Sequence, residues 1–138
     1  MKGSENAAVL VGRILMCVLF IWAGSGKLMN PAAIEASFAK QGVPMVEAAW
    51  LLAVVVELGG GLALLLGLFT RPVGFVLAVW CVLTALIGHT NFADRMQEIN
   101  FFKNMVMAGG FLYVAAFGAP AWSVDAWRLQ RRGIIAAE

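Results

Sequence analysis

The sequence is short of charged residues. Of its 138 residues, 13% are charged and 62% are hydrophobic, whereas a soluble domain typically carries roughly 25% charged residues. A chain of this length exposes a large share of its surface, and a soluble domain needs charge to cover that surface. The composition therefore excludes a soluble enzyme and a disordered tail, and it indicates a protein that lies in a membrane.

Cysteine and net charge are also scarce. The two cysteines, Cys17 and Cys81, lie far apart within apolar runs. A thiol-oxidising membrane enzyme needs a vicinal cysteine pair for disulfide exchange, so we expect both to be packing residues. A net charge of +2 is too small for the basic surface of a nucleic-acid-binding protein. We find no motif for a metal, haem, flavin or nicotinamide, and we expect no covalently bound cofactor.

Long apolar runs are abundant. A membrane-spanning helix uses about 20 mostly apolar residues, and four runs reach or approach that length. The predicted spans are 7–28, 48–69, 72–89 and 101–121. They favour an all-α integral membrane four-helix bundle that occupies residues 1–138 as a single domain. A signal peptide is the alternative for the first run, but Arg13 divides its apolar part and no A-x-A site follows.

The connections differ in character. Ile34, Phe38 and Val43 form one apolar edge of a predicted short interfacial helix, which begins after Pro31 and ends before Pro44. The segment TNFADRMQEIN, which precedes the fourth run, is predicted to be a polar loop. A polar tail follows the fourth run.

The basic residues predict an orientation. With four spans, both termini and the turn at Thr70 lie on one side of the membrane. That side carries Lys2, Arg71, Arg128, Arg131 and Arg132. The loops on the opposite side carry only Lys40 and Arg95. By the positive-inside rule, both termini are predicted to be cytoplasmic.

Ionisable side chains within the predicted spans mark a candidate site, because they are costly in a membrane. Glu57 lies near the middle of the second span, and Arg13 lies about 7 Å from the middle of the first, at ~1.5 Å per residue. We predict that these two form a buried structural ion pair that fixes the helix register. The outer helix ends carry Lys27, His89, Lys103 and Asn104. In the alternative interpretation, the lysines are interfacial anchors and the histidine is a hydrated helix cap.

Helical spacing groups these residues on faces. One face of the first span carries Arg13, Cys17, Phe20, Gly24 and Lys27. One face of the third span carries Gly74, Ala78, Cys81, Ala85 and His89. In the second span, Glu57 shares its face with Gly60, Gly61 and Leu64. Steps of three and four place residues on one side of a helix, and small residues let helices approach closely in lipid. These faces are predicted to line the interior.

Converging polar faces would form an outward-opening cavity. The predicted ligand-binding residues are Lys27, His89 and Lys103 near its mouth, with Asn104 beside Lys103 and Glu57 at the floor. With Arg13 included, the three cations against Glu57 leave about +2, which favours an anionic or carbonyl-bearing ligand. A quinone headgroup, an organic acid, a sulfur oxyanion or a lipid phosphate would fit. His89 is the candidate catalytic proton donor, because an imidazole titrates close to neutral pH.

In their order and spacing these residues resemble the DoxX family of small four-helix bacterial membrane proteins. The resemblance runs from Gly12 to Gly110. In the first span it rests on Arg13 and on FIWAGSGK at residues 20–27. In the second it rests on ELGGG at 57–61, with LG at 66–67 and TR at 70–71. His89 and Lys103-Asn104 complete it. The positions that match the polar motif of the family are Arg13, Lys27, Glu57, His89, Lys103 and Asn104.

The resemblance implies a function. The family is similar to the quinone-reducing membrane subunit of thiosulfate:quinone oxidoreductase. It implies a multi-pass protein of the bacterial inner membrane that interacts with a quinone and is associated with oxidoreductase activity. The electrons would come from a redox partner protein or directly from a substrate. The alternative is a non-redox binding or transport module for a small anion or lipid. Expected partners are the lipid bilayer, a redox partner protein and further copies of the chain.

Overall fold

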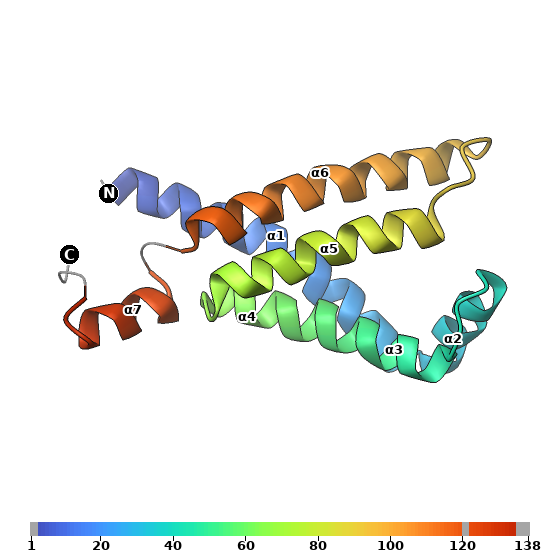
Figure 1. Ribbon diagram of the computed structural model, residues 1–138, viewed down its shortest axis with the longest axis horizontal. Helices are drawn as coiled ribbons and strands as arrows, with labels where there is room; N and C mark the ends of the chain where they lie inside the picture. The colour runs from blue at the N-terminus through green and yellow to red at the C-terminus, as the bar shows by residue number, and fades with distance from the viewer. Residues whose placement is uncertain (1–2, 120–121, 135–138) are drawn as a thin grey trace.

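The computed structural model describes residues 3–119 and 122–134, which form helices joined by short connections, with no strand among them. The helices are α1 (Gly3–Met29), α2 (Pro31–Lys40), α3 (Val46–Val54), the π-helical turn η1 (Val55–Gly59), α4 (Gly60–Leu66), α5 (Thr70–Gly88), α6 (Arg95–Phe117) and α7 (Val124–Arg131). Since α3, η1 and α4 follow one another without a break, they form one continuous helical segment (Figure 1).

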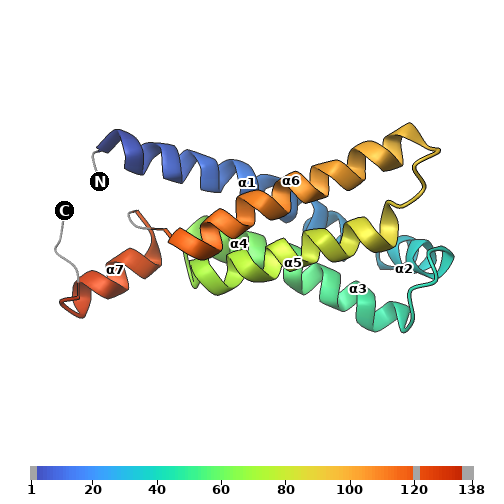
Figure 2. The ribbon, with the colours of Figure 1, turned by 45° about the horizontal axis from the view of Figure 1, so that its top comes forward.

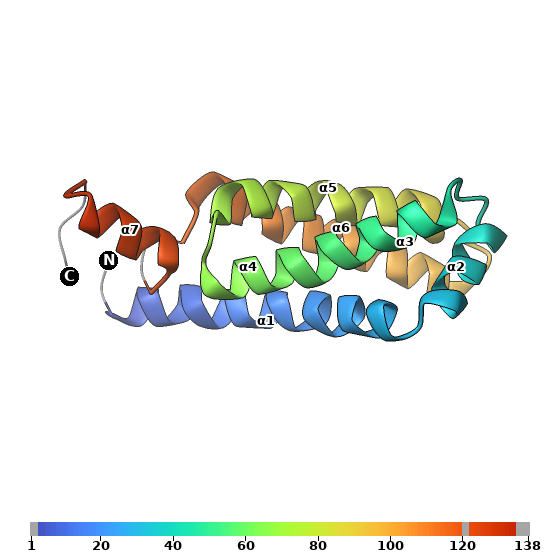
Figure 3. The same cartoon turned by 90° about the horizontal axis from the view of Figure 1, so that it is seen from below.

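The long helical segments lie side by side. Helix α1 packs against η1 and α4, α4 packs against α5, and α5 packs along α6 (Figure 3). Helix α2 lies at the end of the molecule opposite to α7 (Figure 2), where it contacts α3. The start of α1 and the short α7 lie at the same end (Figure 1).

Three of these segments are long and apolar enough to cross a membrane. They are Gly3–Met29, Val46–Leu66 and Thr70–Gly88, and they coincide with the first three predicted spans to within a few residues. Helix α6 is 23 residues long, but it includes Arg95, Glu98 and Lys103. The fourth span remains a prediction.

Two connections differ from the sequence prediction. The polar loop is shorter than predicted, since α6 begins at Arg95 and not at position 101. The Asp94 side chain accepts a hydrogen bond from the Met96 amide and so caps the start of the helix. The predicted tail contains α7, which begins where Ser123 accepts a hydrogen bond from the Ala126 amide. The short helix after Pro31 is confirmed as α2. The end predicted for the fourth span, at residues 120–121, lies outside the described residues.

The core contains the faces that helical spacing predicted. In α1 the buried residues include Arg13, Cys17, Phe20 and Gly24. In α5 they include Gly74, Ala78, Cys81 and Ala85. Both cysteines belong to the hydrophobic core cluster, which confirms them as packing residues. The rings of Phe20 and Phe111 meet edge to face with centroids 5.1 Å apart, so the core joins α1 to α6.

A close approach at Gly24 fixes how α1 packs against η1. A Cβ atom added at Gly24 would lie 2.5 Å from the Leu58 backbone nitrogen and 2.9 Å from its Cα. Real Cβ atoms are not found at such distances, so any larger residue would push the two backbones apart. Gly26 is only two positions away, but a Cβ there meets nothing within 4 Å.

At the other end, Asp125 holds α7 against the start of α5. One carboxylate oxygen accepts a hydrogen bond from the Phe69 amide at 3.0 Å. The other accepts bonds from the Thr70 amide, at 2.7 Å, and from the Thr70 hydroxyl. Burial by itself raises the pKa of Asp125, but the hydrogen bonds from Thr70 and Phe69, together with the positive charge of Arg128, outweigh it and hold that pKa below its ordinary value of 3.8.

We expect Gly24→Ala to destabilise the protein by at least about 1–3 kcal/mol, the usual cost of overpacking, since the new methyl group would meet backbone. Gly26→Ala is the matched control and should be neutral or slightly stabilising, because alanine favours helix over glycine. Thermal unfolding of both variants in detergent measures the difference. Equal melting temperatures would contradict the close approach.

We expect the docking of α7 to depend on pH. Because the folded-state pKa of Asp125 is lowered, its contribution to stability is present above about pH 4 and is lost as the pH falls through the lowered value. Asp125→Asn should increase hydrogen exchange in α7 at neutral pH and should remove the acid-induced step. Hydrogen exchange followed by mass spectrometry between pH 6 and pH 2.5 tests this. The same acid step in both proteins would show that another group is responsible.

Candidate functional site

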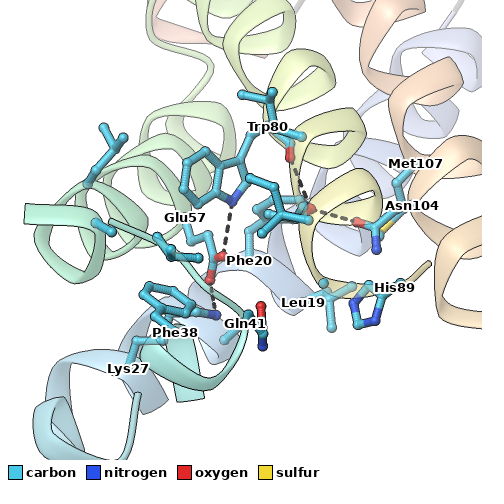
Figure 4. A pocket seen from close by; sticks show the side chains of 18 residues that line it. Leu19, Phe20, Lys27, Phe38, Gln41, Glu57, Trp80, His89, Asn104 and Met107 are labelled. Atoms are coloured by element: carbon cyan, nitrogen blue, oxygen red, sulfur yellow. Dashed lines mark hydrogen bonds and ion pairs between the residues drawn. The ribbon is translucent and has the colours of Figure 1, made fainter. Parts of the chain in front are cut away.

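A cavity of about 470 Å³ lies between α1, α2, the α3–η1 segment, α5 and α6 (Figure 4). Most of its wall is apolar, and includes Phe20, Phe38 and Leu83. Its polar wall consists of Lys27, Gln41, Glu57, Trp80, Thr84, His89 and Asn104. A mainly apolar pocket with a few converging polar groups is typical of a small-molecule site.

Glu57 is the centre of the first polar group. It lies in η1, and π-helical turns within α-helices often occur at functional sites. One carboxylate oxygen accepts a hydrogen bond from Lys27 Nζ at 2.6 Å, and the other accepts one from Trp80 Nε1 at 3.0 Å. The side chains of Glu57 and Lys27 are only 8% and 21% exposed. The carboxylate is therefore paired and hydrogen-bonded through both oxygens, as a buried charge requires.

The position of Lys27 is supported from α3 and α2. Trp50 Nε1 donates a hydrogen bond to the Lys27 backbone oxygen at 2.8 Å, which ties the end of α1 to α3. Phe38 and Gln41, at the end of α2, line the cavity beside Lys27 (Figure 4). The short helix thus forms one wall of the candidate site.

A second polar group lies across the cavity on α5 and α6 (Figure 4). The Thr84 hydroxyl lies 3.3 Å from Asn104 Oδ1 and also bonds to the backbone oxygens of its own helix. Asn104 Nδ2 donates to the Asn100 backbone oxygen at 3.0 Å. His89 Nδ1 lies 2.8 Å from Gln97 Oε1. An amide oxygen can only accept, so in this arrangement His89 Nδ1 donates the hydrogen bond to Gln97.

The predicted Arg13–Glu57 ion pair is wrong. Glu57 pairs with Lys27, whereas Arg13 Nη2 donates to the Trp122 backbone oxygen at 2.7 Å. The reason is the packing register. A Cβ at Gly67 would lie 3.0 Å from Arg13 Nη1, so Arg13 is level with Gly67. That level is about 15 Å along the helix from Glu57, at ~1.5 Å per residue.

The prediction that Lys103 shares the cavity is also wrong. Lys103 is exposed and lines a separate groove with Arg95 and Glu98, whereas its neighbour Asn104 lines the cavity. Successive helical residues point about 100° apart, so an inward Asn104 turns Lys103 outward. With Arg13 also elsewhere, Lys27 is the cation of this cavity, and Glu57 neutralises it. The cavity is close to neutral and does not carry the predicted charge of about +2.

Two polar residues of the cavity, Trp80 and Thr84, are not among the site residues predicted from the sequence. The sequence does contain a signal for Trp80. An indole within an apolar span needs an acceptor for its N–H, and Glu57, the acidic residue near the middle of the second span, is a candidate acceptor. Among the described residues there is no cluster of three or more His, Cys, Asp or Glu side chains that could hold a metal ion.

Comparison with known proteins supports the family resemblance. The chain matches the DoxX family over residues 8–90. It is 42% identical over 125 residues to inner membrane protein YqjF of Escherichia coli (strain K12), covering 91% of this chain and 95% of that protein. It is 36% identical over 122 residues to inner membrane protein YphA of the same organism, covering 85% and 87%. No solved structure matches the chain significantly. With its apolar helices, the protein is a multi-pass protein of the bacterial inner membrane.

We expect Lys27 and Glu57 to be energetically coupled. Lys27→Met or Glu57→Gln alone should destabilise the protein by about 3–5 kcal/mol, because each leaves a buried partner unpaired. The double variant should cost about 1–3 kcal/mol less than the sum. Unfolding in detergent provides the three free-energy differences.

Arg13→Met combined with Glu57→Gln is the control cycle. Because these two residues are about 15 Å apart along the bundle, their effects should add to within ~0.5 kcal/mol. Coupling in the control cycle but not in the Lys27–Glu57 cycle would contradict the assigned pair.

Proposed function

The chain belongs to the DoxX family, and from this premise we propose that it is a four-span, quinone-binding protein associated with oxidoreductase activity. In this proposal α6 is the fourth span, the four long segments form a bundle, and both termini are cytoplasmic. The extended packing of α6 along α5 supports the bundle. The arginines at the α7 end support the orientation by the positive-inside rule.

The observation that carries the proposed ligand is the neutrality of the cavity. A small anion would need uncompensated positive charge, but the positive charge of Lys27 is paired with Glu57 at 2.6 Å. A neutral carbonyl compound needs only hydrogen-bond donors and an apolar wall, and both are present. This argues for the quinone over the alternative, a non-redox module for a small anion. A lipid acyl chain would use the apolar wall but not the polar groups.

The donor set fits quinone carbonyl oxygens. A lysine ammonium has three donors, of which one is directed to Glu57, so the others are available to a ligand. On the opposite wall, Asn104 Nδ2 has a second N–H besides the one that bonds to Asn100. Glu57 orients Lys27 and Trp80, and we assign it the role of an organiser rather than a proton carrier.

A bound quinone would supply two-electron chemistry, with electrons from a redox partner protein or a substrate. His89 is the candidate for proton transfer, since its Nε2 can bind a proton while Nδ1 remains bonded to Gln97.

Blocking the cavity tests the binding proposal. Ala49 lines the cavity, whereas the adjacent Ala48 is exposed and does not. We expect Ala49→Phe to weaken binding of a short-chain ubiquinone or menaquinone analogue by about tenfold or more, the loss of roughly 1.4 kcal/mol, and Ala48→Phe to leave it unchanged. Calorimetric titration of the detergent-purified protein measures both. Equal binding by the two variants, or competition by thiosulfate or phosphate, would overturn the proposal.

The redox role needs a separate test. His89→Gln should retain quinone binding but lose quinone reduction when a reducing partner or substrate is supplied. The readout is the absorbance change of the quinone in proteoliposomes. Undiminished reduction by the variant would remove His89 from the mechanism, and binding without any reduction by the unmodified protein would favour the non-redox function.

A further inference from the structure

A second, basic groove lies at the opposite end of the molecule from His89. It has a volume of about 670 Å³ and is bounded by the start of α5, the end of α6 and one side of α7. Its cationic lining residues are Arg71, Arg128 and Arg132. The predicted quinone cavity shares no lining residue with it.

The three arginines outnumber the one acid of the groove, Asp125, which interacts electrostatically with Arg128. Arg128 lies over the Phe69 ring at 5.4 Å from its centroid, a cation–π contact that leaves its N–H groups available. Arg71 lies against Gly118, where a Cβ would be 3.3 Å from Arg71 Nε. Within the described residues, the side chains of these three arginines make no hydrogen bond or ion pair. Asp125, the acid in the groove, is hydrogen-bonded to Phe69 and Thr70, so the groove retains about two positive charges.

The surroundings indicate that the groove lies at a membrane surface. Its lining residues lie at the start of the apolar helix α5, at the end of α6 and on α7. Helix α7 lies at the end of the molecule where α4 ends and α5 begins (Figure 1). The groove is lined by the exposed Phe69 and Phe117, and two exposed tryptophans belong to the same part of the chain as α7, namely Trp122 just before it and Trp127 on it. Tryptophan is enriched at the level of lipid headgroups, and a short helix with basic and aromatic faces lies in that interface.

We propose that this groove is a binding site for the phosphate of an anionic phospholipid, with Arg71, Arg128 and Arg132 as its ligands. Guanidinium groups pair with phosphate through two parallel hydrogen bonds, and basic pockets beside spanning helices bind such headgroups. The exposed apolar side chains of Phe69 and Phe117 lie next to the acyl region. A bound lipid would brace α7 against α5 and α6, adding to the hydrogen bonds of Asp125.

The test compares lipids and arginines in the purified protein. Native mass spectrometry with added phosphatidylglycerol or phosphatidylcholine should show preferential binding of the anionic lipid. Arg128→Gln/Arg132→Gln should reduce that binding by about fivefold per arginine, or ~25-fold in total. The control, Arg131→Gln/Arg95→Gln, removes the same charge from residues outside the groove, because Arg131 lies over Trp127 at 4.2 Å and Arg95 pairs with Glu98. It should retain the preference.

Further measurements distinguish a lipid phosphate from free inorganic phosphate and exclude misfolding of the variants. Arg128→Lys/Arg132→Lys keeps the charge and should retain most of the preference, with size-exclusion profiles matching the unmodified protein. Equal loss in the groove and control variants would overturn the site. Displacement of the lipid by millimolar inorganic phosphate would show a free-phosphate site, and binding of both lipids alike would show acyl-chain binding only; either result would overturn the lipid proposal.

Discussion

The close approach of α1 to the η1 turn determines where the polar groups of the cavity lie. Gly24 lets the α1 backbone reach Leu58, and Gly61 accepts Phe20 and Ile21 in the same way, since a Cβ there would lie 3.0 Å from Ile21 Cγ1. Helices in lipid associate through such packing, because the surrounding acyl chains are as apolar as the side chains. Once this register is fixed, Lys27, one turn beyond Gly24, lies beside Glu57, which precedes Leu58.

The register has an electrostatic consequence. A buried carboxylate is costly unless its oxygens are paired, and removing it from water is repaid only by good geometry. Lys27 and Trp80 provide that geometry from two other helices. The charges of Lys27 and Glu57 cancel, so the cavity has hydrogen-bond donors but little net charge. The sum of the candidate charges is therefore no guide to the charge of the cavity, since two of the three predicted cations lie elsewhere.

Helical spacing predicted the buried faces, and the apolar runs located the first three long helical segments to within a few residues, because both signals depend on residues close together in the sequence. The Cys17 and Cys81 faces and the start of α2 at Pro31 are of this kind. The partner of Glu57 was not predictable in the same way. The predicted pairing of Arg13 with Glu57 assumes that the middles of all spans lie in one plane. The contacts at Gly24 and Gly61 set a different register between α1 and the segment that carries Glu57. Spacing also could not decide which of two neighbours, Lys103 or Asn104, faces inward.

The end of the molecule around α7 was the least predictable part, and Arg13 explains why it is ordered. Arg13 is 5% exposed, and its Nε and Nη1 atoms have no hydrogen-bond partner among the described residues. Its Nη2 bonds to the Trp122 backbone oxygen, and Asp125 lies close enough to interact with it electrostatically. Burying a guanidinium without acceptors is costly, so the segment that supplies the acceptor is part of the fold.

That segment also determines the charge at this end. By covering Arg13 and bonding to Thr70 through Asp125, it places α7 beside the start of α5. Arg128 and Arg132 are thereby brought next to Arg71 around one groove. Lys27 is neutralised near the opposite end, whereas these three arginines share a single acid, Asp125. The bundle thus separates a neutral cavity from a cationic groove, because Glu57 matches the one cation of the cavity whereas the groove has three arginines and one acid.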